Sequence, residues 1–208
     1  MRIIVRATED QRQEWLSKPA SQNTEVIFTG CTTVEFNKIE GDIFFDLMID
    51  ETKNVFIRTD KPVFINAVTH TLNELPPNCI RINAWEGFLK RKIIEIAAGE
   101  DNKKITAEVM NALNWKYQLV PDIPGMIAPR IISMIINEAY FALQDDVSTK
   151  EGIDIAMQLG TNYPYGPFEW SRKIGLHKVY HLLKKLSETD RRYVVAGSLE
   201  EEIIRKWV

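Results

Sequence analysis

The chain has 208 residues, 45% of them hydrophobic and 26% charged, which is typical of a globular protein long enough for one large or two small domains. Its net charge of −3 argues against nucleic acid or an anionic membrane as a partner. No apolar run reaches the roughly 20 residues that cross a membrane, and no signal peptide precedes the first strand-like residues. We therefore expect a cytoplasmic protein with two free thiols, Cys31 and Cys79.

The first part of the chain, residues 1–120, alternates strand-like and helix-like patterns. Runs rich in branched and aromatic residues predict strands at 3–5, 25–28, 43–48, 54–57, 63–65, 80–82 and 117–120. Helices are predicted after Thr8, whose spacing to Gln11 fits a capping box, and over 106–113. This alternation favours a parallel sheet covered by helices.

The second part, residues 121–208, has only helical patterns. Prolines and a glycine at positions 124, 125 and 129 precede an apolar run that extends to Leu143. The run is apolar on so many sides that it predicts a helix buried among others. A second helix is predicted from Ser148, which has capping-box spacing to Glu151, as far as Gly160.

The end of the chain adds a loop and two further helices. Pro164 and Pro167 interrupt the helical pattern and predict a rigid aromatic loop over 163–168. An apolar stripe from Leu176 to Leu186 predicts a helix, and Ser198 has the spacing to cap a last short one.

Several separate motifs lie between residues 121 and 176. The segment contains P-G-M-I-A-P-R, then E-A, then I-D-I-A-M-Q-L-G-T-N-Y-P-Y-G-P-F-E. It resembles the 3-hydroxyacyl-CoA dehydrogenases, which carry P-G-F-x-x-N-R, E-A and I-D-x-A-M-x-x-G-x-x-x-P-x-G-P-F at this spacing. The resemblance implies a reduced Rossmann-like α/β domain over 1–120 and a helical domain over 121–208. It also implies a homodimer, because the helical domain is the dimer interface in that family.

The resemblance also assigns positions to the family's site. Asn83 stands at the place of the catalytic histidine, and Glu95 stands at the place of the glutamate that orients it. The positions implied to contact substrate lie in the loop after the strand at 63–65 and at the start of the helical domain. They are Asn66, Thr69, Gly125, Pro129 and Arg130.

Three departures from the family pattern bear on the reaction. The first strand is followed by Arg6-Ala7-Thr8-Glu9-Asp10 in place of G-x-G-x-x-G, and acidic residues at a helix start repel a pyrophosphate. Asparagine cannot accept the proton of a hydroxyl group, and loss of a general base costs about 100-fold to 10,000-fold in rate. Pro129 replaces a substrate-contacting asparagine.

One alternative restores the missing base. His70 lies in the loop matched to the family's N-T-S-S turn, where it could act with Glu95. The structural interpretation is a solvent-facing histidine at a helix start.

Three functional hypotheses follow. The leading one is a protein of acyl-CoA metabolism whose dehydrogenase site has degenerated. It would be a CoA-thioester-binding or regulatory module, and we expect it to use no cofactor. The second is a divergent NAD-dependent 3-hydroxyacyl-CoA or 3-hydroxybutyryl-CoA dehydrogenase. The third is a structural or protein-interaction domain.

Overall fold

The computed structural model describes residues 1–19, 24–49 and 58–207. The chain divides into two compact units, Met1–Met126 and Ile127–Val208, each considered by itself. The first unit contains the sheet, and the second is helical. The division falls a few residues after the boundary expected at Pro121, because the turn at Pro124 to Met126 packs with the sheet unit.

The described part of the first unit contains a seven-stranded sheet with the order β2-β1-β3-β4-β5-β6-β7. The strands are β1 (Arg2–Arg6), β2 (Glu25–Thr29), β3 (Ile43–Asp46), β4 (Val63–Ile65), β5 (Cys79–Ile82), β6 (Ile93–Ala97) and β7 (Lys116–Leu119). Neighbouring strands are parallel except β5 and β6, which are antiparallel. The mostly parallel α/β sheet expected from the sequence is thus confirmed. β6 is not among the predicted strands, and the strand predicted at 54–57 lies outside the described residues.

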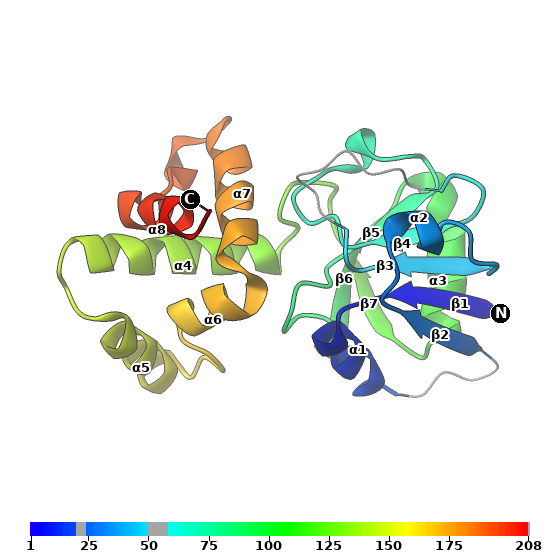
Figure 1. Ribbon diagram of the computed structural model, residues 1–208, viewed down its shortest axis with the longest axis horizontal. Helices are drawn as coiled ribbons and strands as arrows, with labels where there is room; N and C mark the ends of the chain where they lie inside the picture. Colours follow the sequence, from blue (N-terminus) through cyan, green and yellow to red (C-terminus); the bar gives the residue numbers. More distant parts are fainter. Residues whose placement is uncertain (20–23, 50–57, 208) are drawn as a thin grey trace. The chain divides into compact units, whose positions relative to one another are not determined.

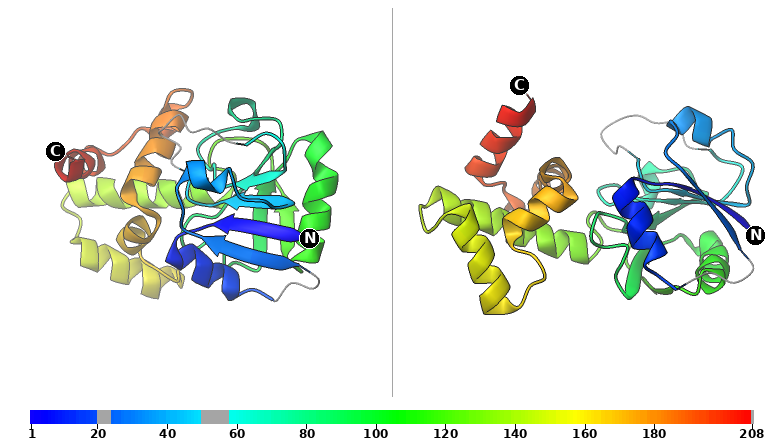
Figure 2. Two further views of the ribbon diagram at one scale, coloured as in Figure 1. Left: turned by 45° about the vertical axis from the view of Figure 1, so that its right-hand side comes forward. Right: turned by 60° about the horizontal axis from the view of Figure 1, so that its bottom comes forward.

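Alternating residues of the strands pack on opposite faces of the sheet. Ile3, Val5 and Phe45 belong to one core cluster, which also contains Trp15 of α1 (Glu9–Leu16) and Val109 of α3 (Lys103–Ala112). Figure 2 shows α1 and α3 on one side of the sheet. On the other side, α2 (Thr33–Phe36) contributes to a second cluster with Ile4 and Phe44. Single-turn helices η1 (Leu72–Glu74) and η2 (Glu100–Asn102) complete this unit.

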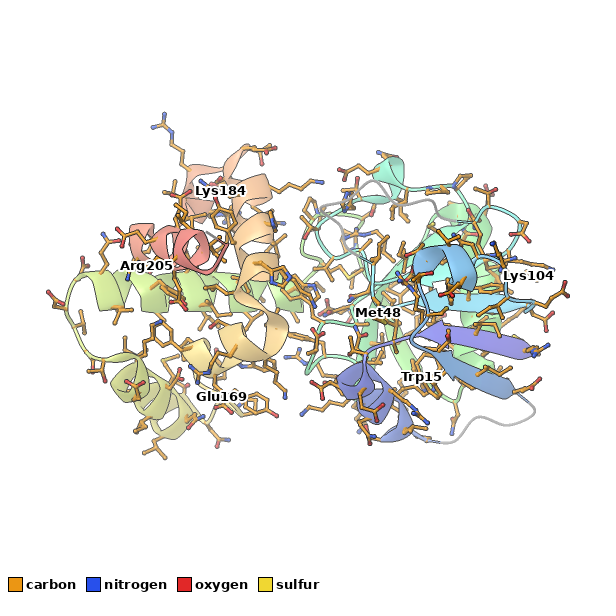
Figure 3. All side chains as sticks on the ribbon, viewed as in Figure 1. Trp15, Met48, Lys104, Glu169, Lys184 and Arg205 are labelled. Carbon is orange, nitrogen blue, oxygen red and sulfur yellow. The ribbon has the colours of Figure 1, made fainter. Side chains whose placement is uncertain are left out.

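Trp15 is the aromatic centre of the α1 side. It meets Phe45 edge to face at 4.9 Å between ring centroids, and Trp115 at 4.3 Å. Figure 3 shows Trp15 on α1. Such pairs add about 0.5–1.5 kcal/mol beyond the area they bury. The aromatic contacts therefore fix α1 against the sheet.

The helical unit is organised around α4 (Ala128–Gln144), which packs against α6 (Pro167–Ile174), α7 (Leu176–Ser187) and α8 (Gly197–Trp207). The remaining elements are α5 (Lys150–Thr161) and η3 (Arg191–Tyr193). Ile132 and Ile136 of α4 are buried, whereas Ile131 is 57% exposed. α4 is thus the central helix that the apolar run predicted, with one side open. Lys184 of α7, labelled in Figure 3, pairs with Glu200 of α8 at 2.7 Å.

Three helix starts differ from the sequence expectation. Thr149, rather than Ser148, caps α5, and its hydroxyl accepts a hydrogen bond from the Gly152 amide at 3.1 Å. The segment predicted as loop over 163–168 becomes helix at Pro167, because proline suits a first helical turn, where its missing N–H costs no hydrogen bond. Ser198 lies inside α8, and its hydroxyl donates to the carbonyl of Tyr140 at 2.7 Å.

Both cysteines are free thiols: Cys79 is buried and Cys31 is partly exposed. Burial raises the pKa of the Cys79 thiol to about 12. Among the described residues, no helix has both the length and the hydropathy needed to cross a membrane.

Candidate active site

The sequence-predicted positions of the first unit gather at the carboxyl edge of the sheet. β1, β3, β4 and β5 are parallel neighbours, so their carboxyl ends lie at one edge. Asn66 directly follows β4, and Asn83 directly follows β5. In open α/β sheets, ligands bind at this edge, at the point where the strand order reverses. Here the order reverses at β1, which has β2 on one side and β3 on the other.

A buried ion pair occupies that reversal point. Arg6 ends β1, Asp46 ends β3, and the two are partners in the strand register. The Arg6 guanidinium donates through Nε and Nη2 to the two carboxylate oxygens at 2.9 and 3.0 Å. Both residues are buried, and burial raises the pKa of Asp46 against the opposing effect of Arg6. The cation at this edge is thus already neutralised by the chain's own carboxylate.

The N-terminus of α1 is also satisfied by its own residues. The Thr8 hydroxyl accepts from the Gln11 amide at 3.2 Å, and the Gln11 side chain accepts from the Thr8 amide at 3.0 Å. The capping box predicted from the sequence is therefore confirmed. In dinucleotide-binding proteins, free amides at this helix start receive the pyrophosphate. Here two of them have intramolecular partners, and Glu9 and Asp10 add negative charge to the first turn.

Two further side chains of α1 anchor the loops of this edge. Gln11 is 1% exposed, and its Nε2 donates to the carbonyls of Leu47 at 2.8 Å and Ala84 at 3.0 Å. Glu14 accepts from the backbone amides of Gly87 and Lys90. Side chains of α1 thus connect the loops that follow β3 and β5. In Rossmann-type proteins, the start of this helix instead contacts the nucleotide.

The NAD site of the Rossmann type is not formed by these residues. The turn after β1 has no glycine, so each residue carries a Cβ where a pyrophosphate approaches the backbone. β2 ends at Thr29 and is followed by Gly30 and Cys31. It therefore provides no carboxylate for a ribose hydroxyl at the usual place. The described residues do not fit the cofactor at this edge.

Asn83 and Glu95 occupy facing positions on adjacent strands. The backbone amide of Asn83 donates to the Glu95 carbonyl at 3.1 Å, which continues the antiparallel register of β5 and β6. Directly opposite residues of such a pair point to the same face. Asn83 is 3% exposed, and its Oδ1 is a buried atom without a hydrogen-bond partner in the described part of the chain. A ligand that offers a hydroxyl or amide proton would satisfy it.

Asn66 has intramolecular hydrogen bonds at both ends of its side-chain amide. Its Nδ2 donates to the Leu47 carbonyl at 3.1 Å, and its Oδ1 accepts from the Ala84 amide at 2.9 Å. Asn66 is 4% exposed. The structure therefore places this predicted substrate residue as a clamp between the loops after β3 and β5.

The loop with Thr69 and His70 is held by Arg81, which is fully buried on β5. Arg81 donates to the carbonyls of Ala67 at 2.8 Å and Val68 at 2.9 Å, and it pairs with Asp122 at 2.6 Å. Thr69 is buried and His70 is partly exposed. The sequence analysis missed Arg81, because an arginine in a strand pattern carries no motif that points to such a role.

Gly125, near the C-terminal end of this unit, contacts the same loop through its backbone. Its amide donates to the Val68 carbonyl at 2.8 Å, and its φ of 81° lies in the left-handed region that favours glycine. The predicted substrate position is thus one that needs glycine for backbone geometry.

Pro129 and Arg130 belong to the helical unit. Pro129 is buried in the first turn of α4. The Arg130 guanidinium lies over the Tyr193 ring, 5.0 Å from its centroid. Its Nε is buried with no hydrogen-bond partner within the described ranges. The first turn of α4 therefore presents a cation that an aromatic ring orients.

Comparisons with known proteins agree with the motifs. Residues 125–206 match the model of the 3-hydroxyacyl-CoA dehydrogenase C-terminal domain. The chain is 32% identical over 150 residues to 3-hydroxyadipyl-CoA dehydrogenase of Escherichia coli (strain K12), covering 70% of this chain and 32% of that protein. It is 29% identical over 164 residues to 3-hydroxybutyryl-CoA dehydrogenase of Clostridioides difficile, covering 74% and 56%. The chain thus spans less than two thirds of the length of these relatives.

Solved structures show the same fold. FadB2 of M. tuberculosis superimposes with a TM-score of 0.70 at 14% identity, covering 99% of this chain and 93% of that one. The (S)-3-hydroxybutyryl-CoA dehydrogenase PaaH1 of Ralstonia eutropha gives a TM-score of 0.67 at 17% identity, covering 88% and 71%. A Rossmann-like sheet followed by a helical domain is therefore the architecture that these chains share.

Proposed function

The chain belongs to the 3-hydroxyacyl-CoA dehydrogenase family, and from that premise we propose that it binds a CoA thioester without transferring hydride to NAD. It would act in acyl-CoA metabolism as a binding or regulatory module. The observation that carries the part of the proposal about NAD is the Arg6–Asp46 ion pair at the reversal point of the sheet, and the part about ligand binding rests on the buried, unpaired Oδ1 of Asn83.

The ion pair bears on the cofactor. The acidic residues in the first turn of α1, Glu9 and Asp10, would oppose the pyrophosphate of NAD. Two donor atoms of the Arg6 guanidinium, Nε and Nη2, are occupied by Asp46, so a phosphate would compete with that carboxylate for the cation.

The chemistry of position 83 supports the same proposal. By the family resemblance, Asn83 stands where a histidine removes the hydroxyl proton of the substrate. An amide has no basic group near neutral pH, so it can orient an oxygen but cannot take the proton. The unpaired Oδ1 of Asn83 is suited to accept a hydrogen bond from a bound ligand.

A homodimer through the helical unit is part of the proposal. α5 has no buried residue although it contains Ile153, Ile155, Met157 and Leu159. Leu159 is 83% exposed and Ile155 is 55% exposed. A helix with an apolar side in water is stabilised when a second copy covers it.

The test uses two titrations of the same preparation. NADH binding is followed by its fluorescence, and 3-hydroxybutyryl-CoA binding is followed by calorimetry. We expect no NADH saturation up to about millimolar and saturable binding of the thioester in the micromolar range, roughly −8 kcal/mol. Micromolar NADH binding would overturn the proposal that the chain does not use NAD. Failure of thioesters of several chain lengths to bind would remove the proposal as a whole and leave an interaction domain.

The second candidate is a divergent NAD-dependent dehydrogenase with His70 as base. The observation in its favour is that Arg81 fixes the loop before His70 at the carboxyl edge, where Asn83 also lies. It requires thioester-dependent NADH formation that is lost in His70→Ala and kept in His181→Ala, a histidine of the helical unit.

A further inference from the structure

The helical unit contains a cavity that no feature of the dehydrogenase site uses. Its volume is about 540 Å³, within the range of roughly 300–1,000 Å³ that is typical of small-molecule sites. It opens between α4, the start of α5, α6, the start of α7 and α8. The lining residues are Tyr140, Lys150, Phe168, Ser171, Arg172, Leu176, His177, Glu202 and Ile203.

One wall of the cavity is apolar and well ordered by packing. Tyr140 and Phe168 are each 1% exposed and meet edge to face at 4.9 Å between centroids. Leu176, at 7% exposure, and Ile203 line the same space from α7 and α8. Lys150 Nζ lies over both rings, 5.4 Å from each centroid. The apolar surface open to a ligand therefore comes from Leu176 and Ile203, and it favours a short hydrocarbon or aromatic group.

The acidic group of the cavity is already neutralised. Glu202 accepts from the Tyr140 hydroxyl at 2.9 Å and pairs with Lys150 Nζ at 2.5 Å. Burial, followed by the hydrogen bond to Glu202, raises the pKa of Tyr140, so its hydroxyl keeps the proton that it donates. This three-residue cluster adds no net charge to the cavity.

Arg172 supplies the positive charge that remains. Its one ion pair among the described residues is with Asp154 Oδ2 at 3.5 Å, near the limit of a direct contact. Asp154 is already held by the backbone amides of Phe168 at 2.7 Å and Glu169 at 3.1 Å. The Arg172 side chain is 62% exposed at the cavity. Its guanidinium is free to turn toward an anion, which it can bind through two parallel hydrogen bonds.

We infer that this cavity is a binding site for a small monocarboxylate with a short apolar chain or ring. The carboxylate pairs with Arg172, and the apolar part lies against Leu176 and Ile203. One guanidinium suits a single carboxylate, whereas the several phosphates of coenzyme A exceed it in charge. The site lies wholly within the helical unit and does not depend on the proposed function at the sheet.

The test titrates the full chain with hexanoate by calorimetry at constant ionic strength. We expect saturable binding with a Kd below about 1 mM. Hexan-1-ol, which has the same chain and no charge, is expected to bind at least about tenfold more weakly, because it lacks the charge-assisted pair. No heat of binding for hexanoate up to about 10 mM would overturn the inference.

Matched variants locate the site. Arg172→Gln is expected to raise the Kd of hexanoate about tenfold or more. Arg172→Lys is expected to raise it less, because lysine keeps the positive charge but cannot form two parallel hydrogen bonds with the carboxylate. Lys173→Gln removes the same charge from the neighbouring residue of α6, which does not line the cavity, and should change the Kd by less than about twofold. Equal effects of Arg172→Gln and Lys173→Gln would mean nonspecific attraction and would refute the site. Because Arg172 is largely exposed, each variant should keep the thermal midpoint of the wild type.

Discussion

Arg6 and Asp46 end adjacent parallel strands and form a buried bidentate ion pair at the point where the strand order reverses. They are 40 residues apart in the chain. The pair occupies the edge of the sheet where Rossmann-type proteins bind a nucleotide. At this edge the chain thus has a buried ion pair and a turn without glycine, where the family has a glycine-rich turn.

Arg6→Met should lower the free energy of unfolding by about 3–5 kcal/mol, because it leaves the Asp46 carboxylate buried without its partner. The double variant Arg6→Met with Asp46→Leu should recover most of this loss, since no charge stays buried. Urea denaturation measures both. Arg12→Met, which removes an exposed pair with Glu9, should cost less than about 1 kcal/mol. A double variant as unstable as the single one would contradict this account of the pair.

Asn83→His alone should not produce a dehydrogenase. The substitution returns the basic group, but the nucleotide edge still carries the Arg6–Asp46 pair and a turn without glycine. The measurement is NADH oxidation with acetoacetyl-CoA, compared with the wild type at equal concentration. Turnover in Asn83→His that exceeds the wild type would show that NAD binds by another route, and the proposed function would then need revision.

Thiol labelling should separate the two cysteines. Cys79 is 1% exposed with a pKa raised to about 12, so at pH 8 only about one thiol in ten thousand is ionised. We expect a chromogenic disulfide reagent at pH 8 to react within minutes with one thiol, Cys31, and with the second after unfolding. Cys31→Ser should abolish the fast phase. Two fast thiols in the native wild type would contradict the burial of Cys79.

Charges on the exposed side of α5 should dissociate the proposed homodimer. Leu159→Glu together with Ile155→Glu places two carboxylates on the apolar side of the helix, where a second copy would bury them. Light scattering after gel filtration should report a dimer for the wild type and a monomer for the variant. Leu16→Glu, at an exposed position of the sheet unit, is the control and should leave the mass unchanged. A monomeric wild type at high concentration would remove the homodimer from the proposal.

Glu200 should make the helical unit sensitive to acid. Its hydrogen bonds with Lys184, and then with Tyr180, lower the pKa of its carboxyl group. A carboxyl group whose pKa is lower in the folded state stabilises that state above its unfolded pKa of about 4.3. This stability is lost as the pH falls through the folded value.

The stability difference between wild type and Glu200→Gln should therefore be present at pH 6 and shrink toward pH 3. Urea denaturation across this range measures it. The effect is small because the Glu200 side chain is partly exposed to solvent. A difference that grows toward pH 3 would have the wrong sign.

Local patterns in the sequence predicted many elements correctly. The capping box of Thr8 and Gln11 is formed as expected, because both partners lie within one helical turn. Alternating branched residues placed β1 to β5, and the apolar run placed α4. The patterns missed β6, which directly follows the charged run at 90–92 and contains Glu95 in its middle.

Placement of the site positions could be predicted only in part. Asn83 and Glu95 lie opposite one another through a backbone hydrogen bond, and their roles in a site stay a prediction. Asn66, in contrast, uses its amide between the loops at Leu47 and Ala84. Nothing near Asn66 in the sequence indicates those partners, since they come from two other loops.

By itself, the sequence determined the family, the order of a sheet unit and a helical unit, and the absence of glycine from the turn after the first strand. Each of these depends on residues that are close in the chain or on the chemistry of one side chain. Only the tertiary structure decided that Arg6 meets Asp46, that Arg81 holds the loop before His70, and that Arg172 borders a cavity. These relationships join distant segments through burial and charge pairing, which are properties of the packed chain and leave no local pattern in its sequence.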